Sequence, residues 1–303
     1  MPAGPDALFQ REGPLVLEIG FGDGRFLVEL ERLHPEWNLL GVEISLASVS
    51  RAFRRMHREG IEHVRLYRGH GRMVVRDFLK PDSLRRIYVN FPDPWPRRNQ
   101  VSYRLLQPAF FRMAANRLAP GGDLLLTTDH AEYFAFARES ARASGVMSEA
   151  LGEPPPETLR TKYALKWQEE DRPIYHVVFT PTDNPPPPER ATQSQPMQHA
   201  LLDGDLSAVR SFSKHVRQFD GGTVIVLEAY RSLTDDGVTF EVVVEEADLR
   251  QELLVKAWEK EDGVFVGLQP FGDPMGTRGC REAVHAVTDV LTGYGLTVRQ
   301  AWI

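Results

Sequence analysis

The sequence predicts an α/β fold in which a parallel sheet with helices on both faces is followed by a smaller α+β domain. Strand-like apolar runs alternate with helical periodicity along residues 15–180, which is typical of a parallel sheet covered on both faces. After residue 201, strand-like runs instead follow one another closely, with turn signals between them. A proline-rich stretch separates the two rhythms, so the chain of 303 residues is expected to form two domains.

The first domain is expected to span residues 1–180. Its strands are predicted at residues 15–20, 38–43, 64–67, 87–91, 123–127 and 173–180. Its helices are predicted at residues 25–33, 46–58, 103–118 and 131–143. Gly60 is expected to end the second helix, and Pro120-Gly121-Gly122 the third, because glycine adopts positive φ and proline interrupts helices.

The second domain is expected to span residues 201–303. Residues 181–200 are rich in proline and polar residues, which predicts a semi-rigid, extended linker before it. Its strands are predicted at residues 223–229, 238–245, 252–258, 264–269 and 297–303, with one helix at 281–291. Acidic residues among these strands suit phosphate contact poorly, so we expect a structural or protein-contact role.

The composition favours a cytosolic protein. A single cysteine, Cys280, excludes an intramolecular disulfide framework, and the first residues lack the basic and apolar regions of a signal peptide. No apolar run is long enough to span a membrane. The net charge is −6, yet arginine and lysine gather between residues 51 and 104. Such a local basic face favours an anionic partner, although solvated helix faces would give the same pattern.

A proline-rich loop follows the strand predicted at residues 87–91. Prolines stand at positions 92, 94 and 96, and each fixes φ and removes a backbone donor, so neither a strand nor a helix can continue. The loop holds one carboxylate, Asp93, and one indole, Trp95, with two arginines directly behind. Because ligands bind at the carboxyl ends of strands in open α/β sheets, we expect a ligand site here.

A glycine-rich turn, Glu18-Ile19-Gly20-Phe21-Gly22-Asp23-Gly24, follows the first predicted strand. It permits a tight bend and a close approach of the backbone to a ligand. The dinucleotide pattern would need a glycine at position 25, where the chain has arginine. A carboxylate in the strand end would repel a pyrophosphate and favour a ligand with ammonium and sulfonium charges, such as S-adenosylmethionine. Glu43 can accept both ribose hydroxyls. NAD and a purely structural turn are the alternatives.

These segments together resemble the tRNA (guanine-N7-)-methyltransferase family of bacterial type. The resemblance rests on Leu17–Gly24, Asn38–Glu43, Asn90–Pro96, Thr127–Asp129, Thr161–Tyr163 and Arg172–His176. It covers residues 10–180 and leaves the second domain outside. The Phe-Pro-Asp-Pro-Trp run is its most specific part, since many methyltransferases share the glycine loop.

The resemblance implies a cytoplasmic enzyme with a Rossmann-like, S-adenosylmethionine-dependent methyltransferase sheet. Such enzymes methylate N7 of a guanine in tRNA, usually guanine 46 of the variable loop, so tRNA is the implied partner. The cofactor-binding residues are then Glu18, Gly20, Gly22, Gly24, Glu43, His70 and Asp93, and Asp93 is also the catalytic residue. The substrate-binding residues are Arg97, Asp129, Thr161, Lys162 and Tyr163. We expect no metal and no membrane contact, and the choice between monomer and homodimer stays open.

Two positions depart from the family pattern. His70 stands where an acid usually contacts the adenine end, and Ala164 stands where the substrate motif has glutamate. The basic run is also thinner than usual, although Arg97, Arg98 and Arg104 remain either to hold phosphates or to form a solvated loop. These departures keep two other functions open: a methyltransferase for another RNA or a small molecule, and a catalytically weakened RNA-binding protein with the same fold.

Guanine N7 carries a free lone pair, so its methylation needs positioning and electrostatic stabilisation rather than a general base. Asp93 can hydrogen-bond the guanine edge or the cofactor, or it can only cap the turn. Trp95 can stack on the base or pack in the core. Asp129 can contact the substrate or cap the helix that follows it. Lys162, by itself, is an ordinary basic loop residue.

Overall fold

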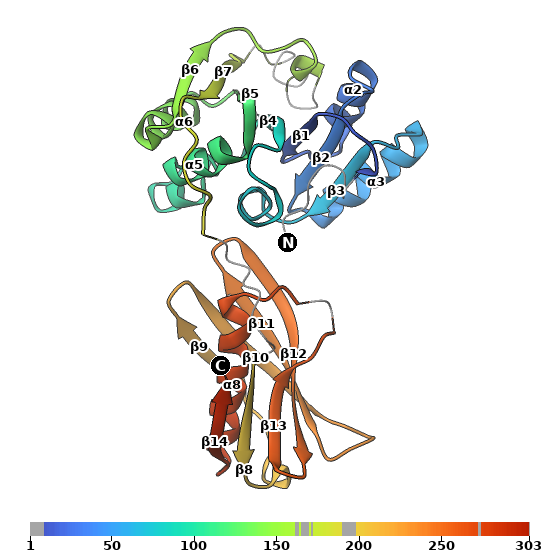
Figure 1. Ribbon diagram of the computed structural model, residues 1–303, viewed down its shortest axis with the longest axis vertical. Helices are drawn as coiled ribbons and strands as arrows, with labels where there is room; N and C mark the ends of the chain where they lie inside the picture. The colour runs from blue at the N-terminus through green and yellow to red at the C-terminus, as the bar shows by residue number, and fades with distance from the viewer. Residues whose placement is uncertain are drawn as a thin grey trace. The chain divides into compact units, whose positions relative to one another are not determined.

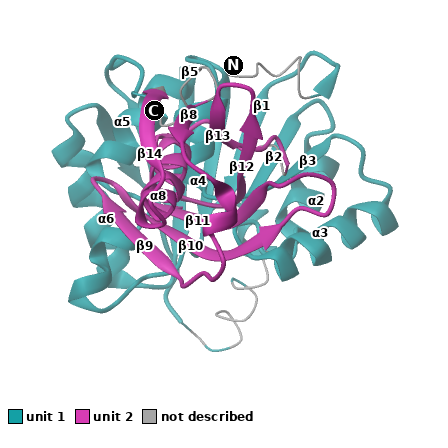
Figure 2. Ribbon diagram, turned by 90° about the horizontal axis from the view of Figure 1, so that it is seen from below, with its two compact units in different colours: residues 1–189 teal, residues 190–303 magenta. Residues whose placement is uncertain are grey.

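The computed structural model describes residues 9–160, 164, 170, 172–189, 198–271 and 274–302. The chain divides into two compact units, residues 1–189 and 190–303, which Figure 2 draws in different colours. Each unit is built around one seven-stranded sheet. The predicted site residues all fall in the first unit, so its topology is the part of the fold that matters most for function.

The sheet of the first unit has the strand order β3-β2-β1-β4-β5-β7-β6 (Figure 1). Its strands are β1 (Leu15–Ile19), β2 (Asn38–Glu43), β3 (Val64–Arg68), β4 (Leu84–Asn90), β5 (Leu118–Thr128), β6 (Met147–Leu151) and β7 (Tyr175–Pro181). The first five strands are parallel, and β1 pairs with both β2 and β4. The strand order therefore reverses between β1 and β4, which is the switch point where open α/β sheets bind ligands.

The predicted α/β fold class is confirmed, but the sheet is parallel only from β3 to β5. β7 runs antiparallel to both β5 and β6, so the expectation of a parallel sheet is wrong at this edge. Antiparallel neighbours such as β6 and β7 can be joined without a crossover helix, so helix–strand alternation does not extend to them. β6 was not predicted, because its short sequence Met-Ser-Glu-Ala-Leu lacks a strong strand pattern.

Helices cover both faces of this sheet. They are α2 (Arg25–Leu33), α3 (Leu46–Glu59), α4 (Gly71–Met73) continued by a π-helix (Val74–Phe78), α5 (Pro108–Arg117) and α6 (Ala131–Ser144). Val16 and Tyr88 belong to an apolar layer shared with α2 and α3. Leu17 and Val89, their chain neighbours, belong to the layer shared with α5 and α6. Alternate residues of each buried strand therefore support opposite layers of helices.

The helix predicted at residues 103–118 is shorter than expected. A 3-10 helix, Arg98–Tyr103, comes first, and α5 begins only at Pro108, because proline fits the first turn of a helix, where no donor is needed. Pro120-Gly121-Gly122 does not separate the helix from the strand but lies inside β5. A Cβ at Gly122 would lie 2.9 Å from the carbonyl oxygen of Leu84, so the strands approach closely there.

The described residues at the start of the proline-rich stretch are hydrogen-bonded to the first unit. Thr182 N donates to Val146 O (2.9 Å), and Asn116 Nδ2 donates to Pro185 O (2.8 Å). Pro185 itself is buried. The first residues of the predicted linker are thus bound to the first unit, while residues 190–197 lie outside the described part of the chain.

The second unit has the strand order β14-β8-β13-β12-β11-β10-β9, and all its neighbouring strands are antiparallel. The strands are β8 (His199–Asp203), β9 (His215–Phe219), β10 (Gly222–Arg231), β11 (Val238–Glu246), β12 (Leu249–Lys260), β13 (Gly263–Leu268) and β14 (Thr297–Trp302). α8 (Arg278–Gly293) packs on one face, where Ala283 and Val287 join the core. The predicted α+β arrangement is confirmed, although β8 and β9 were not predicted.

Candidate active site

Four acidic residues predicted for the site stand at the carboxyl ends of β1, β2, β4 and β5. Glu18 is the penultimate residue of β1, and Glu43 is the final residue of β2. Asp93 follows β4, and Asp129 follows β5. Because these strands are parallel, their carboxyl ends meet at one edge of the sheet (Figure 1). The fold therefore brings four carboxylates from distant parts of the sequence to the switch point.

The glycine loop combines free space with close packing. Gly20, Gly22 and Gly24 have φ values of 85°, 56° and 75°, which L-residues with side chains rarely adopt. A Cβ at Gly20 or Gly22 would meet no described atom within 4 Å, so this part of the loop is open. A Cβ at Gly24 would lie 2.7 Å from Ala52 Cβ, so the third glycine lets α2 approach α3.

Glu18 is buried, with 3% of its surface exposed. Burial raises the pKa of Glu18 to about 8; the adjoining Asn90 amide lowers this pKa in part, and the charges of Glu43 and Asp23 raise it further. Among the described residues, neither Glu18 Oε2 nor the side-chain oxygen and nitrogen of Asn90 reaches a hydrogen bond of good geometry. Buried polar atoms without partners are rare, so this pair marks a place suited to a polar ligand.

Glu43 ties the glycine loop to the end of β2. Its Oε2 accepts from Gly22 N (3.1 Å), and its Oε1 accepts from Ser45 N (2.9 Å). Gly69 N donates to Glu43 O (3.0 Å), which places His70 next to the end of β2. His70 is exposed and precedes α4. The predicted cofactor residues Glu18, Glu43 and His70 therefore lie at the carboxyl ends of the neighbouring strands β1, β2 and β3.

The proline loop has an unusual backbone on both sides of Asp93. Phe91 and Trp95 have φ values of 49° and 43°, in the left-handed region that non-glycine residues rarely occupy. Phe91 N donates to Thr127 O (2.7 Å), which holds the start of the loop against β5. Asp93 is exposed. Strained residues of this kind gather at functional sites, where the surrounding structure holds them.

The prediction that Arg104 holds phosphates is wrong, because Arg104 is buried and only 3% of its surface is exposed. Its Nε donates to Pro94 O (2.8 Å), and its Nη2 donates to Trp95 O (3.2 Å) and Glu132 Oε1 (2.7 Å). A guanidinium committed to these acceptors has no face left for solvent. The nearby arginines at positions 97 and 98 are exposed, as phosphate contact requires.

Trp95 is half-buried, which leaves part of its ring exposed, and its stacking on a base stays a prediction. Its ring meets the ring of Tyr103 edge-on, with centroids 5.4 Å apart. Tyr103 is 65% exposed. The two rings form an aromatic surface close to Asp93, which is a suitable platform for a base.

Asp129 does not cap α6, so its alternative role is wrong. The N-cap is His130, whose Nδ1 accepts from Tyr133 N (3.2 Å). Asp129 is half-buried, and its Oδ2 lies 3.5 Å from Arg172 Nη1. Its carboxylate therefore stays at the site edge with a cation beside it.

The substrate motif Thr161-Lys162-Tyr163 lies outside the described residues, so its placement stays a prediction. Ala164 is fully buried. Because the residue is alanine, this position offers no carboxylate where the resembled family has glutamate.

The basic stretch is a smaller surface than the sequence suggested. Arg55 pairs with Asp23 (2.9 Å), and Arg86 forms two bonds with Asp123 (2.6 and 2.8 Å). These arginines stabilise the fold rather than face a partner. In the described ranges, exposed arginines without an ion pair include Arg54, Arg97 and Arg98.

Sequence reasoning did not single out Asn90 as a site residue, and it assigned Arg104 a different role. Asn90 is a polar residue at the end of an apolar strand, directly before the proline loop, and this position was a usable signal. Arg104 carried no such signal, because its burial depends on residues of α6. Across the described positions, no three His, Cys, Asp or Glu side chains gather as a metal site would require.

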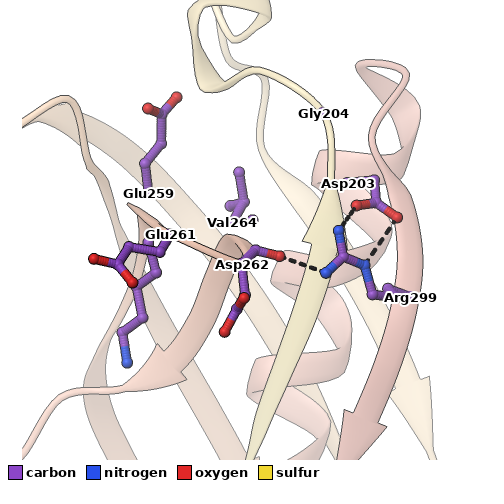
Figure 3. Close-up of a pocket in the computed structure, with 9 residues that line it drawn as sticks. Asp203, Gly204, Glu259, Glu261, Asp262, Val264 and Arg299 are labelled. Atoms are coloured by element: carbon purple, nitrogen blue, oxygen red, sulfur yellow. Dashed lines mark hydrogen bonds and ion pairs between the residues drawn. The ribbon is translucent and has the colours of Figure 1, made fainter.

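A hollow of about 470 Å³ lies in the second unit (Figure 3). Its rim carries Asp203, Glu259, Glu261 and Asp262. Arg299 donates to the side chain of Asp203 and to the backbone carbonyl of Asp262. Carboxylates dominate this rim, so it is unsuited to a polyanion. We therefore place the candidate active site in the first unit.

Comparison with known proteins matches a family model to the first unit and full-length relatives to both units. Residues 12–177 match the family model described as "Putative methyltransferase". A tRNA (guanine-N(7)-)-methyltransferase of Thermus thermophilus is 45% identical over 293 residues, covering 97% of this chain and 94% of the relative. One of Deinococcus radiodurans is 43% identical over 295 residues, covering 94% and 91%. Both matches extend across the two units, so the expectation that the resemblance leaves the second domain outside is wrong.

Among solved structures, the aminoglycoside resistance methyltransferase NpmB1 aligns with a TM-score of 0.42 and 16% identity. The alignment covers 60% of this chain and 95% of that one.

Proposed function

The chain belongs to the tRNA (guanine-N(7)-)-methyltransferase family, and from this premise we propose how its first unit works. The enzyme transfers a methyl group from S-adenosylmethionine to N7 of a guanine in tRNA. The observation that best supports the assignment of residues is the meeting of Glu18, the glycine loop, Glu43 and Asp93 at one switch point. Each is a residue type that this cofactor or this reaction needs.

The residues at this edge of the sheet fit S-adenosylmethionine. Glu18 and Asn90 offer unpaired buried polar atoms to an ammonium group. Each carboxylate oxygen of Glu43 accepts one hydrogen bond within the protein. Each oxygen keeps a further lone pair that can accept from a ribose hydroxyl. Gly20 and Gly22 leave open space for the ligand. His70 stands beside this group of residues, at the expected adenine end.

The bound cofactor supplies an electrophilic methyl group on a sulfonium. Guanine N7 needs no deprotonation, so the chain has to place the base in line and stabilise the positive charge that develops on it. We assign the charge stabilisation to the exposed carboxylate of Asp93, with Asp129 on the substrate side. The aromatic surface of Trp95 and Tyr103 would hold the base by stacking.

The tRNA is proposed to reach this edge through its phosphates. Arg97 and Arg98 are exposed directly after the proline loop and suit such contacts. Thr161, Lys162 and Tyr163 are proposed to complete the substrate side, and guanine 46 is the proposed target. In the described residues no helix is long and apolar enough to cross a membrane. A tRNA substrate supports a cytoplasmic location.

The test is incubation of the enzyme with bulk tRNA lacking 7-methylguanosine and a labelled methyl donor, followed by mapping of the labelled base. Label in 7-methylguanosine of the variable loop is expected. Asp93→Ala should remove the label, whereas Glu139→Gln, a change of an exposed carboxylate on α6, should not. Label in another RNA or in a small molecule would favour the alternative that the buried Ala164 and the thinned basic run suggest.

The second unit is proposed to support the enzyme without contacting tRNA phosphates. Exposed acids are distributed along β11, β12 and the turn after it, at Glu245, Glu252, Glu259, Glu261 and Asp262. Such a surface repels a polyanion. A chain ending at residue 189 should keep the salt dependence of tRNA binding. A shallower dependence in the shortened chain would assign phosphate contacts to the second unit.

A further inference from the structure

Arg104 lies beneath the loop that carries Asp93. It follows the 3-10 helix Arg98–Tyr103, and its side chain is 2% exposed. Its Nε donates to Pro94 O (2.8 Å), and its Nη2 donates to Trp95 O (3.2 Å). Because Pro94 and Trp95 come directly after Asp93, a single guanidinium holds the backbone on the carboxyl side of this carboxylate.

The prolines leave this loop with few backbone donors of its own. The prolines at positions 92, 94 and 96 have no N–H to donate. Trp95 adopts a φ of 43°, which persists in a non-glycine residue only when its surroundings hold it. The two carbonyls bonded by Arg104 belong to Trp95 and to the residue before it. The guanidinium therefore bonds the loop at the strained residue itself.

The guanidinium is in turn fixed by α6. Glu132 Oε1 accepts from Nη2 at 2.7 Å, and the Phe136 ring centroid lies 4.9 Å from Cζ. The Tyr133 ring lies 5.9 Å away on the same helix. These contacts connect the proline loop to a rigid element that packs on the sheet, so the position of the loop depends on α6.

We propose that Arg104 is a positioning residue, which sets the Asp93 carboxylate against the reacting base and does not itself contact tRNA. This inference rests on the proposed function, because it takes the role of Asp93 from there. Without the guanidinium, Trp95 is free to return to negative φ, and the carboxylate moves with it. A misplacement of about 1 Å can lower a rate by ~100-fold.

The experiment compares Arg104→Lys with Arg117→Lys. Arg117 is a matched control, because it is also a buried arginine (2% exposed) that donates to a backbone carbonyl, Val75 O (2.8 Å), at the opposite edge of the sheet. Single-turnover methyl transfer is measured at saturating tRNA, and the tRNA Kd is measured over a salt series. We expect Arg104→Lys to lower the rate by roughly 30-fold or more. Arg117→Lys should keep the wild-type rate even where its Tm falls.

The salt series separates positioning from phosphate contact. Loss of one phosphate contact reduces the slope of log K against log salt by about 0.7–0.9. We expect this reduction for Arg98→Gln and no change of slope for Arg104→Lys. A wild-type rate in Arg104→Lys, or a weaker Kd with a reduced slope, would overturn the proposal.

A readout without methyl transfer keeps the two proposals distinguishable. In protein labelled with 5-fluorotryptophan, the ¹⁹F signal of Trp95 is assigned by Trp95→Phe. Arg104→Lys should shift or broaden this signal and leave that of Trp37 unchanged. An unchanged Trp95 signal refutes the positioning role. If the wild-type enzyme methylated no tRNA, the proposed function would fail, and the fluorine spectra would still decide whether Arg104 holds the loop.

If Arg104→Lys does not fold, the wild-type enzyme provides the test. Phenylglyoxal modifies accessible arginines, and mass spectrometry locates the sites. Arg104 should stay unmodified with and without tRNA, whereas the exposed Arg98 should react in the free enzyme and be protected by tRNA. Modification of Arg104 in the free enzyme, followed by protection in the complex, would make it a tRNA contact and end the proposal.

Discussion

Binding of S-adenosylmethionine is expected to release a proton from Glu18. Burial raises the pKa of this carboxyl to about 8, so at pH 7 roughly 90% of it is protonated in the free enzyme. An ammonium group placed beside it favours the ionised form and lowers its pKa. Close to one proton should therefore leave for each cofactor bound at pH 7, and far fewer at pH 9.

The size of the effect follows from the raised pKa. A change from 4.5 to about 8 corresponds to on the order of 5 kcal/mol between the two protonation states of this fully buried group. Below pH 4.5 both folded and unfolded chains are protonated at this position, and no stability is lost. Between pH 4.5 and 8 only the unfolded chain ionises, so the stability of the free enzyme falls as pH rises, and it levels off above about 8.

Titration calorimetry at pH 7 in phosphate and in Tris measures the proton release, because the two buffers have different enthalpies of ionisation. Glu18→Gln should bind the cofactor more weakly and with no proton release. The same variant should be more stable than the wild type at pH 8, and the difference should shrink towards pH 5. Equal binding heats in both buffers for the wild type, or a stability difference independent of pH, would refute this account of Glu18.

Three further predictions concern the same edge of the sheet. Asp93→Ala should abolish methyl transfer to tRNA with an unchanged Tm, measured by labelled-methyl incorporation; full residual turnover contradicts the catalytic role. Glu43→Ala should raise the Kd for S-adenosylmethionine by roughly tenfold or more, the scale of a lost charged hydrogen bond, and an unchanged calorimetric Kd counts against it. The Kd for tRNA should rise steeply with salt concentration. A Kd independent of salt would contradict the assignment of Arg97 and Arg98 as phosphate contacts.

Sequence reasoning predicted the first unit well where strands and helices alternate. The bounds of α2 and β2 are those predicted, because their apolar residues follow one clear period. It missed β6, and it predicted β7 as a strand but not its antiparallel direction, because direct pairing replaces a helical crossover there. It also misplaced the start of α5, since the apolar positions before Pro108 imitate a helical face.

The candidate site was predictable to the extent that it depends on residue type and strand ends. The glycine loop, Glu43 and the proline loop all lie where parallel strands end, and this placement follows from the order of elements. The role of Arg104 was not predictable, because an arginine in a basic run looks like any other until its burial is known. Glu132 and Phe136, which fix it, come about thirty residues later in the chain.

The sequence by itself therefore determined the stiff loop around Asp93, the bend of the glycine loop and the acids beside them. Proline and glycine restrict or free φ through their own covalent structure, so these features need no distant partner. Only the tertiary structure decided which cations face solvent, which one bonds the loop, and that burial raises the pKa of Glu18. Burial and ion pairing depend on atoms that folding brings together, and a linear pattern of residues does not contain that information.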